Sequence, residues 1–146
     1  MIEVSAQRSI GASPEAVYEA IADMEQHPRF LPDAFSDFRI EMGGRGAGTV
    51  TSFKVNAGGR IRSYRMRVDE PEPGRVLTET DTESSLVTTF TVEPEGTGSR
   101  VTIDTAWQGA GGIGGFFERT FAPRVMRRLY VEELGRLEDY VRTRER

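Results

Sequence analysis

Cysteine is absent from this chain of 146 residues, and histidine occurs once, as His27. Without cysteine the chain has no disulfide framework, no thiol nucleophile and no cysteine-ligated zinc site. A single histidine also excludes a metal site that needs several imidazoles. We therefore expect no metal and no cofactor, and the lack of cysteine favours a reducing, cytoplasmic location.

Long hydrophobic runs are absent too, since no segment approaches the length of a membrane span. Residues 1–7 alternate between apolar and polar side chains, whereas a secretory signal joins a basic segment to an apolar one. The net charge is -4 and the pI about 5.2, while nucleic-acid backbones are bound by clustered Lys and Arg. The sequence thus predicts no integral membrane association, no secretory signal and no nucleic-acid partner.

What the chain does contain is the composition of one globular domain. Hydrophobic residues make up 37% and charged residues 29%, and apolar positions are spread over the whole length. A chain of this size buries roughly two thirds of its unfolded surface around one core. We therefore expect a single domain over residues 1–146.

The N-terminal region predicts a strand followed by a helix. Residues 2–10 alternate with the period of two that is typical of a half-buried strand. Ser13 supplies a capping hydroxyl and Pro14 a first-turn proline, so we expect a helix from there to about Met24. Two prolines then interrupt the chain on either side of a short apolar turn.

Residues 35–107 predict an antiparallel meander. Short runs of alternating apolar and polar residues follow one another, separated by glycine and proline. Parallel strands would need long crossover connections, for which the spacing leaves no room. With the N-terminal strand the expected sheet has seven strands: 2–10, 38–42, 51–55, 64–68, 75–81, 86–92 and 101–107.

The C-terminal segment predicts the longest helix. A glycine-rich stretch at 109–115 leads into residues 116–143, where apolar side chains recur along one side with helical spacing. Pro123 falls within this segment and should kink or restart the helix there, because proline removes a hydrogen-bond donor.

Five short motifs point to a family. They are SPEAVY at 13–18, IADMEQHPRFLP at 21–32, GTV at 48–50, VDEP at 68–71 and GTGSRVT at 96–102. With these motifs, the chain resembles the START-like SRPBCC superfamily over essentially its whole length, in particular the branch of polyketide cyclases/dehydrases and lipid-transport proteins. The resemblance implies an α+β helix-grip fold, in which a seven-stranded curved antiparallel sheet wraps a long C-terminal helix, with two short helices between strands 1 and 2.

The resemblance also implies a cavity between the sheet and the C-terminal helix. Alternation independently places apolar and aromatic side chains on the inner face of the sheet, as in many small-molecule sites, although the same side chains would also suit a filled core. The expected lining consists of Phe53, Val55, Tyr64, Met66, Leu86, Thr88, Phe90, Ile103, Thr105, Trp107, Phe117, Phe121 and Val125.

Tyr64 and Arg62 are the candidate catalytic residues. A phenol donates a proton or a hydrogen bond, and an inward arginine holds a carboxylate or enolate oxygen. The resemblance to the cyclase branch implies such roles for Arg and Tyr, while the alternative is that Arg60 and Arg62 extend to solvent.

Other ionisable residues have simpler interpretations. His27 precedes a proline between two helices, so we interpret it as a surface or turn residue. Glu79 and Asp81 lie near a strand end beside a turn and are interpreted as solvated carboxylates without raised pKa values.

Three functions are compatible with the sequence. The leading hypothesis is the binding of a hydrophobic small molecule, such as a lipid, an isoprenoid or a polyketide-like compound, by a monomer or homodimer. A second is an aromatase/cyclase acting on a polyketide, so whether the chain is an enzyme stays open. A third is a module that binds a protein partner through an exposed surface.

Overall fold

The computed structural model describes residues 1–57, 59–108 and 122–144. The strands are β1 (Ile2–Ile10), β2 (Phe35–Met42), β3 (Val50–Ala57), β4 (Arg60–Glu72), β5 (Val76–Asp81), β6 (Val87–Glu95) and β7 (Gly98–Trp107). The helices are α1 (Pro14–Ala22), the 3-10 helix η1 (His27–Phe30) and α3 (Ala122–Arg144). The α+β class and the predicted order of elements are confirmed.

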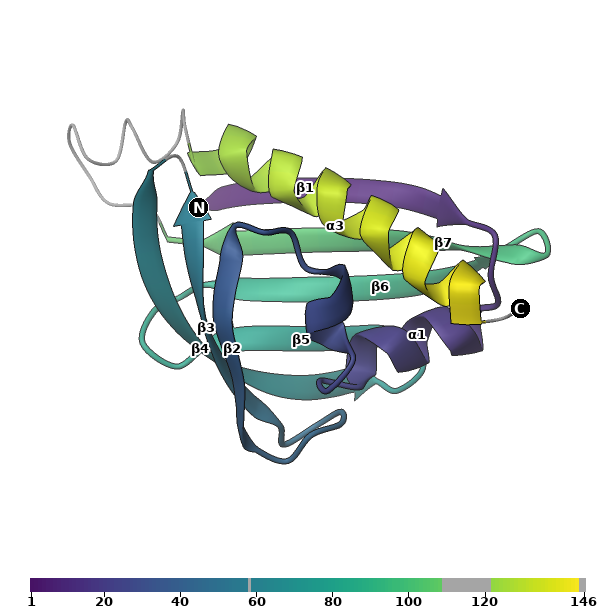
Figure 1. Cartoon of the computed structure of the whole chain (residues 1–146), viewed down its shortest axis with the longest axis horizontal. Coiled ribbons are helices and arrows are strands. Elements are labelled where there is room, and N and C mark those ends of the chain that lie inside the picture. Colours follow the sequence, from purple (N-terminus) through teal and green to yellow (C-terminus); the bar gives the residue numbers. More distant parts are fainter. Residues whose placement is uncertain (58, 109–121, 145–146) are drawn as a thin grey trace.

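The seven strands form one antiparallel sheet in the order β1-β7-β6-β5-β4-β3-β2. Consecutive strands from β2 to β7 are neighbours, and β1 closes the order by pairing with β7 from Ile2 opposite Trp107 to Ile10 opposite Ser99. Figure 1 shows that β2 and β3 turn steeply away from the direction of β5, β6 and β7, so the sheet curls around the helix that crosses it. The predicted seven-stranded curved sheet is therefore confirmed.

Helix α1 begins where its capping sequence predicts. The Ser13 hydroxyl oxygen accepts a hydrogen bond from the Ala16 N–H at 3.2 Å, and Pro14 occupies the first helical position. The helix ends at Ala22, two residues before the predicted Met24, and the chain then enters η1. In Figure 1, α1 lies beside the C-terminal end of α3, and η1 lies between α1 and β2, nearer the middle of the sheet.

Helix α3 lies across the concave face of the sheet (Figure 1). Its buried residues, Tyr130, Glu133, Leu134, Leu137 and Val141, recur at helical spacing and form the inward stripe. Pro123 stands in the first turn of the described helix, a position that proline tolerates. The predicted helical residues before Ala122 lie outside the described part of the chain, and no described helix is long and apolar enough to cross a membrane.

Candidate functional site

A cavity of about 1110 Å³ lies between the concave face of the sheet, η1 and α3. Its wall is formed mostly by apolar and aromatic side chains. The strands contribute Phe35, Phe38, Phe53, Val55, Met66, Phe90 and Trp107, the turn before β6 contributes Leu86, and α3 contributes Ala122, Val125, Met126 and Leu129. Cavities of this size and composition are typical of small-molecule sites.

Most of the lining that alternation predicts is brought together here. The predicted residues that face the cavity are Phe53, Val55, Tyr64, Met66, Leu86, Thr88, Phe90, Trp107 and Val125. Ile103 and Thr105 are instead fully buried in the core beside it. Phe117 and Phe121 lie outside the described residues, and a role of any of these side chains in ligand binding stays a prediction.

One end of the cavity is polar and open to solvent. The described polar lining residues there are exposed: Arg60, Arg62, Ser63, Ser84, Ser85 and Gln108. Tyr64 is half-buried next to them, and burial raises the pKa of its phenol while nearby Arg62 opposes the rise. Both candidate catalytic residues thus line the cavity near its opening, and Arg62 reaches solvent as well.

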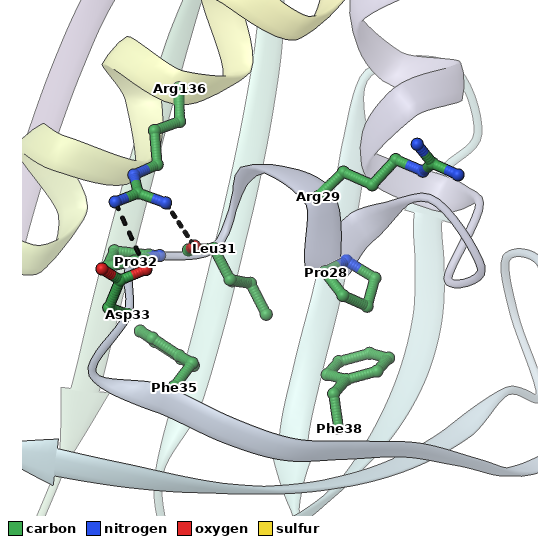
Figure 2. Close-up of a pocket in the computed structure, with 8 residues that line it drawn as sticks. All are labelled: Pro28, Arg29, Leu31, Pro32, Asp33, Phe35, Phe38 and Arg136. Carbon is green, nitrogen blue, oxygen red and sulfur yellow. Dashed lines mark hydrogen bonds and ion pairs between the residues drawn. The ribbon is translucent and has the colours of Figure 1, made fainter.

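A second pocket of about 290 Å³ adjoins the cavity (Figure 2). Leu31, Phe35 and Phe38 line both spaces. On its far side, the Arg136 guanidinium donates to the Leu31 carbonyl at 3.2 Å and approaches Asp33 at 3.6 Å. These contacts tie α3 to the segment between η1 and β2, which forms part of the cavity wall.

His27 is buried, so its interpretation as a surface residue was wrong. The side chain is 3% exposed and packs against the rings of Phe30, Phe38 and Phe90. Its Nδ1 donates to the Ile21 carbonyl at 3.0 Å, which leaves Nε2 as an acceptor in the neutral ring. Burial lowers the pKa of His27 to about 4, so the ring is uncharged at neutral pH.

Glu79 is likewise buried, and its interpretation as a solvated carboxylate was wrong. Alternation along β5 turns Leu77, Glu79 and Asp81 inward, and Thr78 and Thr80 toward the other face. Glu79 lines the cavity together with Glu133 of α3. Burial raises the pKa of Glu79 to about 7. The pKa of Glu133 is also raised well above its usual range, by burial and by the charge of Glu79.

These three side chains form the inner acid cluster, defined here as His27, Glu79 and Glu133. His27 Nε2 lies 4.0 Å from Glu79 Oε1 and 3.9 Å from Glu133 Oε2. Both distances are too long for direct hydrogen bonds. Neither of these two oxygens has a hydrogen-bond partner within the described ranges. The cluster is therefore a buried polar site in which the described residues leave these two carboxyl oxygens without hydrogen bonds.

A row of hydroxyl groups adjoins the inner acid cluster. Glu79, Thr88 and Thr105 are direct neighbours across β5, β6 and β7. The Thr88 and Thr105 hydroxyls hydrogen-bond at 2.8 Å, and Thr105 also hydrogen-bonds the Tyr130 hydroxyl from α3. In contrast to the two unpartnered carboxyl oxygens, these hydroxyl groups have hydrogen-bond partners in one another.

Sequence reasoning missed Glu79 and Glu133, but each carried a signal. Val76 and Leu77 are both apolar, so β5 fits alternation in either phase, and the phase that includes Leu77 turns Glu79 inward. Glu133 follows Met126 and Tyr130 at helical spacing and precedes Leu137 by one turn, so it falls within the apolar stripe of α3.

Proteins that are similar to this chain in sequence or structure share its fold. The family described as Polyketide cyclase / dehydrase and lipid transport matches residues 1–142. The solution structure of the KanY protein (ms6282) is similar with 40% identity and a TM-score of 0.86, over 97% of each chain. The protein TTHA0849 from Thermus thermophilus is similar with 24% identity and a TM-score of 0.80, over 99% of each chain.

An enzyme is among the similar structures. The Zhui aromatase/cyclase from Streptomyces sp. R1128 is 19% identical, with a TM-score of 0.74 over 99% of this chain and 95% of that one. At this identity the likeness concerns the fold alone. No curated protein matches the chain in sequence.

Proposed function

Because the chain belongs to the polyketide cyclase/dehydrase and lipid transport family, we propose that it binds a hydrophobic small molecule in the cavity between its sheet and α3. The family predicted from the sequence motifs is thereby confirmed, and membership is consistent with hydrophobic ligand binding. The observation that carries the proposal is the cavity of about 1110 Å³ with its aromatic and aliphatic wall. A lipid, isoprenoid or polyketide-like compound suits such a wall, since transfer of apolar surface out of water favours binding.

The polar opening is consistent with this use. Exposed Arg60 and Arg62 stand where a ligand enters, while the wall beyond them is apolar. A ligand with a long apolar body and a polar group therefore matches the cavity from its opening inward.

Binding of the neutral dye Nile red tests the proposal, because its fluorescence rises in apolar surroundings. Trp107, the only tryptophan of the chain, lines the cavity and gives an independent intrinsic signal. Leu129→Arg places a charge on the cavity side of α3, and Val131→Arg, at a residue 53% exposed, is the matched control on the same helix.

We expect Leu129→Arg to weaken dye binding about tenfold or more, because a desolvated charge is costly in an apolar wall. The Val131→Arg protein should bind like the wild type. Circular dichroism verifies that both variants fold. If the folded wild-type protein does not bind the dye, or if both variants bind equally well, the cavity is not the binding site.

A polyketide cyclase activity is the second candidate. It is favoured by the position of half-buried Tyr64 beside Arg62 near the opening, where the raised pKa keeps the phenol protonated and able to donate a hydrogen bond. With a polyketide substrate, Tyr64→Phe is expected to abolish turnover while dye affinity stays unchanged. Unchanged turnover would remove Tyr64 from any such mechanism.

A further inference from the structure

The inner acid cluster is the one part of the cavity wall whose polar atoms need a partner that an apolar ligand does not supply. Glu79 is 8% exposed and Glu133 3% exposed, and each has an oxygen without a hydrogen-bond partner in the part of the chain that the structure describes. Unpartnered buried carboxyl groups are costly to a fold, and they persist where a function uses them.

The described chain brings no positive charge to these carboxyl groups. His27, their nearest neighbour, is neutral because burial lowers its pKa to about 4. Arg60 and Arg62, the cationic side chains among the described lining, are exposed at the opening. Of the three acidic side chains that line the cavity in the described ranges, Asp81 accepts hydrogen bonds from the Glu83 N–H and the Ser84 hydroxyl. Glu79 and Glu133 lie instead beside one neutral imidazole, and each keeps an oxygen without a partner among the described residues.

We propose that the inner acid cluster binds the protonated amino group of a ligand whose apolar body fills the remainder of the cavity. The inference rests on the proposed function and narrows its ligand class to cationic amphiphiles, meaning molecules that join an alkyl, isoprenoid or aromatic body to an amine.

The acceptor geometry matches an ammonium group. A primary ammonium has three N–H donors, and the cluster offers three acceptors: Glu79 Oε1, Glu133 Oε2 and His27 Nε2. With hydrogen bonds of about 2.9 Å, an ammonium bridges acceptors that lie about 4 to 5 Å apart. The separations of 4.0 and 3.9 Å from His27 Nε2 fall at the lower end of that range. Rotation of the glutamate carboxyl groups about their terminal bonds, which is nearly free, turns the oxygens toward the cavity.

The charges of the inner acid cluster favour the same ligand class. Burial raises the pKa of both glutamates, which means that their surroundings disfavour the ionised forms. A cation placed between them favours the ionised forms and replaces the water that burial removed. A neutral hydroxyl supplies one donor and no charge, and an anion would be repelled by the carboxylates.

Three ligands with the same decyl chain test the inference: decylamine, 1-decanol and decanoic acid, each below its micelle-forming concentration. Displacement of Nile red from the whole protein near neutral pH reports their affinities. An alkylammonium is fully protonated there, since its pKa resembles the value of about 10.4 for lysine. We expect decylamine to bind at least about tenfold more tightly than 1-decanol, and decanoic acid to bind most weakly.

The double variant Glu79→Gln with Glu133→Gln removes both charges and keeps the side-chain shapes. It should reduce the preference for the amine to within about threefold, while its affinity for Nile red and 1-decanol stays within about threefold of the wild type. Glu132→Gln is the matched control, because this neighbouring glutamate on α3 is about half exposed and pairs with Arg136.

Two outcomes would overturn the inference while the proposed function stands: Nile red binds but decylamine binds no better than 1-decanol, or the double variant keeps the tenfold preference. Tightest binding of decanoic acid would also overturn it and would point to the arginines at the opening. A protein that binds none of the four compounds contradicts the proposed function itself.

Discussion

Two glutamates on neighbouring strands have opposite surroundings. Glu70, near the end of β4, accepts hydrogen bonds from the Tyr18 hydroxyl at 2.6 Å and from the Ala47 N–H at 2.9 Å. These contacts hold its pKa below the usual range. Glu79 in β5 has an oxygen without a partner among the described residues, and burial raises its pKa to about 7.

The difference separates a structural carboxylate from one that is available to a ligand. Donors from α1 and from the segment before β3 hold Glu70, so its charge stabilises the fold. Glu79 and Glu133 face the cavity and their charges oppose folding. The two regions therefore respond oppositely to pH: the contribution of Glu70 is lost as pH falls, whereas Glu79 destabilises the protein as pH rises.

The largest expected effect is the pH dependence that Glu79 imposes. In the folded protein Glu79 keeps its proton to about pH 7, whereas in the unfolded chain the carboxyl loses it near 4.5. The folded state binds more protons in this window, so stability falls as pH rises. Between about pH 5 and pH 8 the wild type should lose about 3 kcal/mol relative to Glu79→Gln.

Urea unfolding at several pH values measures this difference. The lowered pKa of His27 contributes with the opposite sign, because the folded state binds fewer protons there, but His27 is present in both proteins and its effect cancels in the difference. Parallel stability curves for the two proteins would mean that Glu79 is solvated.

The next largest expected difference, about 2 kcal/mol, lies between two glycine substitutions of which only one displaces Glu70. Gly46 has a φ of +66°, and a Cβ there would lie 2.2 Å from Glu70 Oε1. In Gly46→Ala the carboxylate must move away from its donors, Tyr18 and Ala47. Gly48, with a φ of +90° and no atom within 4 Å of its Cβ position, is the matched control.

Gly48→Ala should cost about 1 to 2 kcal/mol of stability for its left-handed backbone. Gly46→Ala should cost about 2 kcal/mol more, because hydrogen bonds to a charged group are lost as well. Urea unfolding compares the two variants. If both variants lose the same stability, the hydrogen bonds of Glu70 contribute little to folding. Glu70 would then not be the structural carboxylate that the comparison with Glu79 requires.

The smallest effect is expected in the hydroxyl row. Tyr130→Phe removes the hydroxyl that bonds Thr105, but Thr105 keeps its hydrogen bond to Thr88. The variant should therefore lose only about 1 kcal/mol of stability, measured by thermal or urea unfolding. A loss as large as that for Gly46→Ala would indicate that Tyr130 also supports the inner acid cluster.

Most of the fold could be predicted from local sequence signals. The Ser13 cap, the alternation of Ile2 and Val4, and the glycine and proline turns act over a few residues, so the existence and order of the strands and α1 could be predicted. Strand ends were missed by up to four residues, as in 64–68 against Arg60–Glu72. The pairing of β1 with β7 was not predicted, because no local signal joins segments so far apart in the chain.

The site was harder to predict, because a periodic pattern identifies the buried face of an element by its apolar residues and does not show which polar residues are buried with them. Glutamate is usually exposed to solvent, and Glu79 was interpreted in this way. The alternation along β5 nevertheless turns its side chain inward. His27 was assigned to a turn, correctly, but η1 folds that turn under the sheet. Burial of a polar residue depends on what packs over it, and a pattern within one element does not carry that information.

The pairing of the first strand with the last also bears on how the protein is made. β1 leaves the ribosome first, but its partner β7 and the helix that packs over both follow about a hundred residues later, and so long a loop closes slowly. A nascent chain can therefore form its central hairpins but not an enclosed ligand chamber. Ligand can stabilise only finished molecules, so its supply would affect how long the protein survives and not how it first folds.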